Sequence, residues 1–154
     1  MFIEVLLAST FGMSEPDFLC LSRNIYFESR NQSVAGQIAV AQVVMNRVKD
    51  SRYPDTVCGV VEQGKMDSNG VIKRNQCQFS WFCDGLTDVP KNKEMWVQSQ
   101  ESAIRAVDMY QLYYDITDGS THYHSTKVNP TWASSIEEIV QIDDHIFYKW
   151  NNIK

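Results

Sequence analysis

The sequence predicts an α+β fold that is mainly helical, with three long helices and a small antiparallel sheet in a single domain. Three segments repeat apolar residues at helical spacing, and two short apolar runs near the C-terminus flank a turn. The 154 residues suffice for one domain with a hydrophobic core, and neither an internal repeat nor a linker divides them. With 44% hydrophobic and 21% charged residues, the chain has the composition of a folded globular protein.

The first helix is expected to begin after Ser14, whose hydroxyl can cap it. Pro16 in the first turn and Asp17 at the third position both favour a helix start. Spacings of three, four and three residues then place one set of side chains on a single face, and a carboxylate ends this apolar stripe. The set is Phe18, Leu21, Ile25 and Glu28.

The second helix is expected to follow Ser33, another candidate cap. Residues 34–48 are apolar on nearly all sides and include small residues, which is typical of a central buried helix. The third helix covers about residues 92–114. The shorter elements are two helical turns at 57–63, a polar loop at 64–75, a strand or extended turn at 77–83, an extended segment at 122–124 and a hairpin at 139–148.

Charge and hydropathy exclude two classes of partner. The net charge is −5, and the acidic excess lies entirely after residue 77. Nucleic-acid binding needs clustered basic residues, but the pairs Lys73–Arg74 and Lys91–Lys93 are isolated. Because no apolar run approaches the roughly 20 residues that cross a bilayer, the sequence predicts no membrane span either.

The N-terminal segment and the cysteines bear on where the protein works. The stretch from Phe2 to Phe11 contains Glu4 and has no Lys or Arg before it, unlike a secretory signal, so we interpret it as part of the mature protein. An even number of cysteines is typical of disulfides, and four cysteines allow three pairings between which the spacing does not choose. These are Cys20, Cys58, Cys77 and Cys83.

Glu28 is the strongest candidate for chemistry. A carboxyl at the end of an apolar helix face should be partly removed from water, which raises its pKa and suits it to donate a proton near neutral pH. The alternative is a surface glutamate that pairs with Arg23 or Arg30.

Histidines and tryptophans supply weaker candidates. His122 and His124 would share one face of a strand, and with His145 they could form a zinc site. No HExxH motif or CxxC spacing supports a metal, and the competing interpretation is side chains that line a groove or pack on a sheet. Trp81 and Trp132, in expected loops or edges, could stack on a sugar ring, or could simply pack locally.

Five blocks of sequence occur together in this chain: NIYFESR (24–30), AGQIAVAQVVMNRV (35–48), YPDTVCGVV (53–61), CQFSW (77–81) and THYH (121–124). In this order they resemble the SleB/CwlJ-type cell-wall hydrolase family, which acts on bacterial peptidoglycan. The resemblance runs from about Cys20 to Tyr148. One block alone would be weak, whereas five in order are highly specific.

We expect a single catalytic domain over residues 1–154, with an N-terminal segment 1–13 and a hydrolase core 14–150. The resemblance implies that this domain has a compact lysozyme-like fold. It implies cleavage of the glycan strand between N-acetylmuramic acid and N-acetylglucosamine. The family's catalytic acid, in its Tyr-x-Glu-Ala-Arg block, matches Glu28, with Ser29 in place of the Ala. The family often continues with Gly-Glu, whereas this chain has Asn31-Gln32, so a supporting carboxylate is missing from that turn.

The number of acids bears on the mechanism. A glycosidase that activates water or forms a covalent intermediate generally needs two carboxyl groups across the scissile bond. A lytic transglycosylase needs one, which protonates the leaving oxygen and then accepts the proton of the sugar's C6 hydroxyl as that oxygen closes on C1. With Glu28 as the one strongly placed acid, we predict a lytic transglycosylase.

Three alternatives remain open at this point. A muramidase-type hydrolase would use Asp84 or Asp118 as second acid. A metal-dependent peptidoglycan amidase or peptidase would use the three histidines. A wall-binding module without turnover would keep the fold and release no new sugar ends.

Around Glu28 we expect an extended edge beside the glycan and an opposite wall. The edge is formed by Gln78, Ser80 and Trp81, and the wall by His122, Tyr123 and His124. We expect peptidoglycan as the substrate, no metal or other cofactor, and no protein partner. Without a clear signal or binding repeat, the chain is expected to act on the cell wall after release from the cytoplasm, as an endolysin of a phage would.

Overall fold

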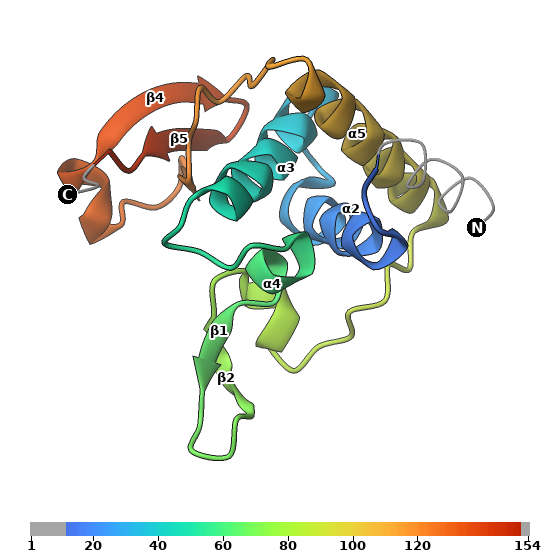
Figure 1. Ribbon diagram of the computed structural model, residues 1–154, viewed down its shortest axis with the longest axis vertical. Helices are drawn as coiled ribbons and strands as arrows, with labels where there is room; N and C mark the ends of the chain where they lie inside the picture. Colours follow the sequence, from blue (N-terminus) through green and yellow to red (C-terminus); the bar gives the residue numbers. More distant parts are fainter. Residues whose placement is uncertain (1–11, 152–154) are drawn as a thin grey trace.

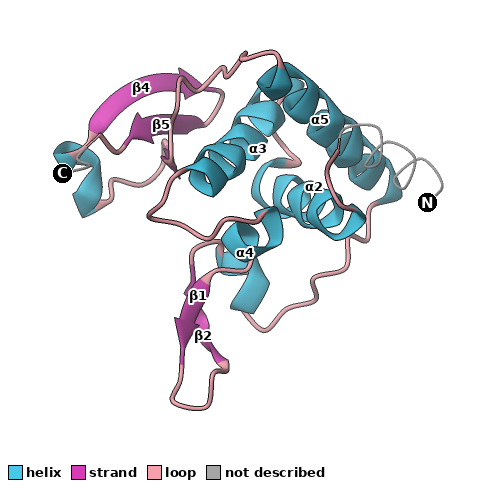
Figure 2. Cartoon of the chain, in the orientation of Figure 1, coloured by secondary structure: helices cyan, strands magenta, loops and turns pink. Residues whose placement is uncertain are grey.

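Helices form the centre of the molecule, and two small sheets lie at its periphery (Figures 1 and 2). The structure is a computed structural model that describes residues 12–151. It confirms the expected α+β, mainly helical fold with a small antiparallel sheet. In chain order the elements are α2 (Glu15–Ser29), α3 (Val34–Lys49), α4 (Val57–Val61), β1 (Gly64–Met66), β2 (Ile72–Cys77), the 3-10 helix η1 (Ser80–Cys83), α5 (Lys93–Gln111), β3 (His122–Ser125), the 3-10 helix η2 (Thr131–Ser135), β4 (Glu137–Ile142) and β5 (His145–Lys149).

Side-chain caps mark the starts of the three long helices, and the caps predicted at Ser14 and Ser33 are confirmed. The Ser14 hydroxyl accepts a hydrogen bond from the Asp17 amide, 3.3 Å away, at the start of α2. Ser33 caps α3 in the same way at 3.2 Å. Asn92 caps α5 through its side-chain oxygen. Each cap satisfies an amide that has no partner within its helix.

Helix α3 lies between the other helices and the three-stranded sheet (Figure 1). One side of it, including Val44, joins the core formed with α2, α4 and α5. Its other side, including Val40, packs against Phe147 of β5. The predicted central helix is therefore confirmed, and it fixes the position of the sheet relative to α2.

The three-stranded sheet is antiparallel, with β5 in the middle and β3 and β4 at its edges. Tyr123 of β3 is opposite Phe147 of β5, and Ser125 is opposite His145. The turn from β4 to β5 contains Asp143 at a positive φ of 51°. The predicted extended segment at 122–124 and the predicted hairpin at 139–148 are thus both confirmed.

A second hairpin, β1 and β2, occupies the segment that the sequence predicted as a polar loop at 64–75. It projects from the helical body (Figure 2), and most of its residues are exposed. The loop prediction was wrong because a strand that buries neither face shows no alternation of apolar and polar residues. Its turn is formed by Asp67, whose side chain accepts the amides of Asn69 and Val71, and by Gly70 at φ 78°.

The segment at 77–83, predicted as a strand or extended turn, ends β2 and then turns into η1. A disulfide joins Cys77 to Cys83, with their Cα atoms 6.1 Å apart. Seven extended residues would separate these atoms by about 20 Å, so the disulfide is incompatible with a continuous strand. The other disulfide joins Cys20 of α2 to Cys58 of α4.

None of the helices within residues 12–151 is long and apolar enough to cross a membrane. The prediction that Phe2 to Phe11 belongs to the mature protein concerns residues outside the described part of the chain.

Candidate active site

Glu28 lies in the last turn of α2, on the face that carries Leu21 and Ile25 into the core. The residue is partly exposed, but its carboxyl group is surrounded by protein. Removal from water raises the pKa of Glu28, and a hydrogen bond from Tyr123 and the charge of Arg47 offset part of this increase. The expected direction of the shift is confirmed, and the carboxyl holds its proton to a higher pH than a free glutamate does.

The alternative of a surface glutamate paired with a neighbouring arginine is wrong. The Arg30 guanidinium bonds the Tyr26 carbonyl at 3.2 Å and lies over the Tyr26 ring. Within residues 12–151, neither Arg23 nor Arg30 forms an ion pair with Glu28. The environment of Glu28 is therefore set by groups far away in the sequence.

Tyr123 provides the direct contact with Glu28. Its hydroxyl donates a hydrogen bond to Glu28 Oε1 at 2.5 Å. Burial raises the pKa of Tyr123 well above its usual value, and the neighbouring Glu28 carboxyl raises it further. The phenol therefore keeps its proton and acts as a permanent donor.

Arg47 of α3 holds the start of β3 in place. Its Nε donates to the Thr121 carbonyl at 2.7 Å, two residues before Tyr123. Its guanidinium lies over the rings of Tyr53 and Phe79, at 5.0 and 5.3 Å from their centroids. A buried cation near the Glu28 carboxyl also favours the ionised form of that carboxyl.

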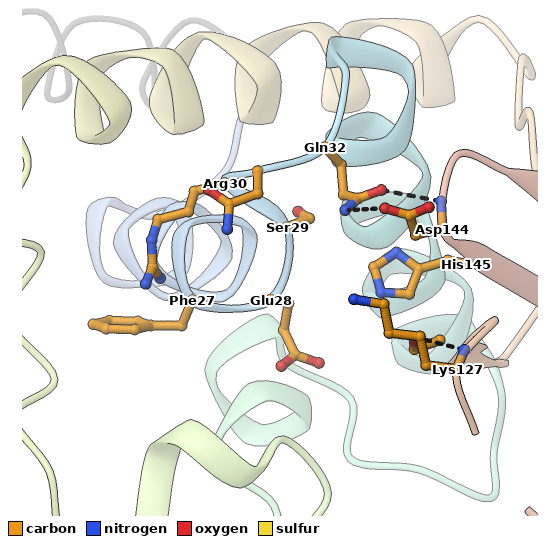
Figure 3. Close-up of a pocket in the computed structure, with 10 residues that line it drawn as sticks. Phe27, Glu28, Ser29, Arg30, Gln32, Lys127, Asp144 and His145 are labelled. Carbon is orange, nitrogen blue, oxygen red and sulfur yellow. Dashed lines mark hydrogen bonds between the residues drawn. The ribbon is translucent and has the colours of Figure 1, made fainter.

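A pocket of about 210 Å³ opens beside Glu28 (Figure 3). One side is formed by the end of α2 and the loop after it, and the other by the segment after β3 and the β4–β5 turn. This pocket is smaller than pockets for drug-sized ligands, which measure roughly 300–1,000 Å³. Its residues are Phe27, Glu28, Ser29, Arg30, Asn31, Gln32, Ser125, Lys127, Asp144 and His145.

The predicted edge at residues 78–81 lies next to the end of α2 but is not extended throughout. Gln78 and Ser80 are exposed, as a binding role requires. Trp81 is only 8% exposed, donates to Asn24 Oδ1 at 2.9 Å and stacks on Phe27 at 4.8 Å. The expectation of Trp81 in a loop or edge is therefore wrong, because the tight 3-10 turn directs its ring inward.

The predicted opposite wall is divided between two faces of the sheet. Because side chains alternate along a strand, Tyr123 points toward Glu28 while His122 and His124 point to the other face. There both histidine rings pack on Trp132, with centroids 5.2 and 5.6 Å away. His124 Nε2 is also 2.8 Å from the hydroxyl of Tyr148. Only Tyr123 of this set contacts Glu28.

The three-histidine zinc site of the metal-dependent alternative is not formed. His145 is opposite Ser125 in the sheet and lies on the face of Tyr123, with ring centroids 5.0 Å apart. It is thus on the other side of the sheet from His122 and His124. In the described part of the chain, the one group of three possible ligands is Cys20, Cys58 and Glu62, and its two cysteines are joined in a disulfide.

Neither predicted second acid lines the Glu28 pocket. Asp84 accepts the amide of Leu86 at 2.9 Å, and Asp118 is exposed in a turn at φ 48°. The carboxylate that does line the pocket is Asp144.

Two pocket residues, Asp144 and Lys127, were not predicted, and no sequence signal indicates Lys127. His145 was predicted only as a possible zinc ligand. The pairing of residues 122–125 with 145–148 would have identified it as a pocket residue, since this pairing places it on the face of Tyr123.

A buried acid and a pocket on an α+β domain define a protein suited to acid-catalysed bond cleavage. Residues 31–148 match the Cell Wall Hydrolase family, and the chain belongs to this family. It is 27% identical over 139 residues to the spore cortex-lytic enzyme of Oceanobacillus iheyensis, a match covering 90% of this chain and 43% of that protein. Identity with the spore cortex-lytic enzyme of Halalkalibacterium halodurans is 28% over 137 residues, covering 88% of this chain and 36% of that protein.

The chain therefore spans less than half of the length of these curated relatives. Among solved structures, it is similar to the catalytic domain of the germination-specific lytic transglycosylase SleB from Bacillus anthracis. The TM-score is 0.69 at 26% identity, and the match covers 90% of this chain and 98% of that one. The resemblance to the SleB/CwlJ-type family is thus confirmed.

Proposed function

We propose that this protein degrades bacterial peptidoglycan by cleaving its glycan strand between N-acetylmuramic acid and N-acetylglucosamine. Family membership and the likeness to a lytic transglycosylase domain support this substrate. The observation that carries the proposal is the enclosed Glu28 carboxyl, whose pKa is raised, at the edge of a pocket. A carboxyl whose pKa is raised keeps its proton to a higher pH, which suits it to protonate a leaving glycosidic oxygen.

The chemistry that we propose is lytic transglycosylation with Glu28 as general acid and then base. Glu28 gives its proton to the glycosidic oxygen as the bond from C1 to that oxygen breaks. The C6 hydroxyl of the muramic acid then gives its proton to the Glu28 carboxylate as O6 bonds to C1, which yields a 1,6-anhydro end and restores the acid. Because Tyr123 occupies Oε1, Oε2 is the oxygen that carries the proton. Arg47 stabilises the carboxylate between the two steps.

We propose that substrate also contacts the exposed Gln78 and Ser80 next to the end of α2. The buried Trp81 holds this segment against the end of α2, because its ring stacks on Phe27. His122 and His124 act indirectly, since their packing against Trp132 holds the strand that carries Tyr123.

The test compares Glu28→Gln with Glu101→Gln, a matched change at an exposed position on α5. On purified cell walls, Glu28→Gln should slow the loss of turbidity at least about 100-fold, and Glu101→Gln should match the wild type. Mass spectrometry of the released fragments should find 1,6-anhydro ends. Full lytic activity of Glu28→Gln would refute the role of Glu28, and freed peptides without new sugar ends would refute glycan cleavage.

A muramidase-type hydrolase is the second candidate, and Asp144 is the observation that favours it. This carboxylate lies in the same pocket as Glu28, and a hydrolase needs such a second acid. Asp144→Asn distinguishes the two reactions, because it should abolish a hydrolase but leave the anhydro product of a transglycosylase. Reducing ends as the main wild-type product would favour hydrolysis.

We propose that the protein acts on the wall in an oxidising compartment. The two disulfides support this location, because such bonds persist outside the reducing cytosol. Mass spectrometry of the protein isolated under alkylating, non-reducing conditions should find no free thiol. Four alkylated cysteines would contradict the proposal.

A further inference from the structure

His145 is the first residue of β5, and its imidazole lines the pocket next to Glu28. Figure 3 shows the ring between Asp144 and Lys127, on the other side of the pocket from Glu28, with its outer edge directed into the pocket. The same ring contacts Tyr123, which binds Glu28. His145 is therefore linked to Glu28 both through the open pocket and through one intervening side chain.

The turn before His145 is fixed to the loop between α2 and α3. The Gln32 side chain accepts the Asp144 amide at 3.1 Å and donates to the Asp144 carboxylate at 3.4 Å (Figure 3). Asp143 accepts the Ser33 amide at 2.9 Å and the Ser33 hydroxyl at 2.5 Å. These contacts hold the His145 backbone at a set position relative to Glu28 before substrate arrives.

The imidazole itself has no hydrogen-bond partner among residues 12–151. Its Nδ1 is fully enclosed and unpaired, and Nε2 lies at the outer edge of the ring. A buried acceptor without a partner is tolerated more often than a buried N–H donor. We therefore assign the proton to Nε2, which gives the pocket an N–H donor.

The surroundings of the ring also favour its neutral form, which carries a single N–H. Burial lowers the pKa of His145, and His124 lowers it further, while Asp143 and Asp144 oppose the shift. Lys127 lies beside the ring in the pocket (Figure 3) and also disfavours a second positive charge there. The imidazole is neutral at neutral pH, with one donor and one acceptor.

We propose that His145 positions the nucleophile of the reaction, by donating from Nε2 to the C6 hydroxyl oxygen of the muramic acid. This inference rests on the proposed function. The hydroxyl gives its proton to the Glu28 carboxylate while its oxygen accepts from His145, so O6 is held for attack on C1. His145 keeps its proton throughout, and the atoms balance as in the reaction above. Glu28 and His145 line this pocket from different sides, so a hydroxyl placed between them would have a polar group on either side.

Two substitutions of His145 distinguish the roles of its two ring nitrogens. The amide nitrogen of glutamine reaches the position of Nε2, whereas that of asparagine reaches only the position of Nδ1. On soluble, uncrosslinked glycan strands, His145→Asn should reduce kcat about 10-fold to 100-fold, with little change in KM. It should also raise the fraction of reducing ends, because water competes with a misplaced C6 hydroxyl. His145→Gln should stay within about threefold of the wild type and keep the 1,6-anhydro product.

Other outcomes would overturn the inference. A wild-type rate and product ratio in His145→Asn would remove any role for the ring. Equal loss in both variants with an unchanged product ratio would indicate a structural role alone. Glycan cleavage that depends on Glu28 but yields only reducing ends would refute the positioning role of His145, while the catalytic role of Glu28 would stand. Absence of new sugar ends with the wild type would refute the proposed function and this inference together.

A measurement without any change at His145 covers the case in which those variants do not fold. Long-range proton–nitrogen NMR on Glu28→Gln protein reports the imidazole tautomer directly. We expect the proton on Nε2, and a shift of the Nε2 signal when a defined tetrasaccharide of alternating N-acetylglucosamine and N-acetylmuramic acid is added. A proton on Nδ1, or an unchanged signal at saturating tetrasaccharide, would contradict the proposal.

Discussion

The Tyr123 hydroxyl lies 2.5 Å from Glu28 Oε1, although the two residues are 95 positions apart in the sequence. This contact joins the last turn of α2 to the edge strand of the sheet. It fixes one carboxyl oxygen and leaves the other available to the pocket. The orientation of the proposed general acid therefore depends on how β3 is held against the helices.

Replacing Tyr123 by Phe should change the pH dependence of activity. The Tyr123 hydrogen bond lowers the pKa of Glu28, so its loss should raise that pKa further. Because the protonated form of Glu28 is the proposed active one, the alkaline decline of kcat should move to higher pH. We expect kcat at the optimum to fall about 5- to 10-fold, as for a lost hydrogen bond of about 1 kcal/mol.

The measurement is kcat on glycan strands across the pH range, for Tyr123→Phe and the wild type. Tyr113→Phe is the control, because Tyr113 is 95% exposed and should leave the profile unchanged. An alkaline limb that stays in place or moves to lower pH would show that Glu28 does not set it.

Glu28→Gln should be more stable than the wild type at neutral pH. The folded protein raises the pKa of Glu28, so the folded state binds a proton that the unfolded state releases above the usual carboxyl pKa. Stability of the wild type therefore falls with rising pH between the unfolded and folded pKa values, by up to about 1.4 kcal/mol per pH unit. The glutamine variant lacks this loss.

Denaturant unfolding of the two proteins at several pH values tests this. The difference in unfolding free energy should increase with pH from the usual carboxyl pKa upward and then level off. A constant difference across this range would show that Glu28 has the same pKa in both states.

The two disulfides should contribute unequally to stability. Cys20 and Cys58 are 38 residues apart, whereas Cys77 and Cys83 are 6 apart. The entropy of loop closure predicts losses of about 4 and about 2 kcal/mol when each pair is replaced by serine. Thermal or denaturant unfolding of the two double variants measures these losses, and a larger loss for the short loop would contradict the loop-length argument.

Chelation should leave activity unchanged. His145 lies on the opposite face of the sheet from His122 and His124, so the three rings do not converge on a single ion. Wall lysis before and after dialysis against a strong chelator checks this, with a known zinc amidase as positive control. Loss of activity that added zinc restores would support the metal-dependent alternative.

Much of the fold follows from local patterns. The three long helices begin at side-chain caps, and the spacing of apolar residues after each cap defines a helix. The capping residues are Ser14, Ser33 and Asn92. The β1–β2 hairpin could not be predicted in this way because most of its residues are exposed, so it buries no apolar face. Trp81 was misplaced for a related reason: a 3-10 turn closed by a disulfide has no periodic signature in the sequence.

By itself the sequence determined the family and the helices and singled out Glu28 as the candidate acid, since each rests on residues that are close together along the chain. The tertiary structure alone decided which groups surround that carboxyl. Tyr123 contacts it from β3, and Asp144 and His145 line the same pocket from the β4–β5 turn and the start of β5. Strand register decides the placement of Tyr123 and His145, because it sends alternate side chains to opposite faces of the sheet. Register depends on long-range pairing and packing against α3, so neighbouring residues such as His122 and Tyr123 have different surroundings that their sequence positions do not reveal.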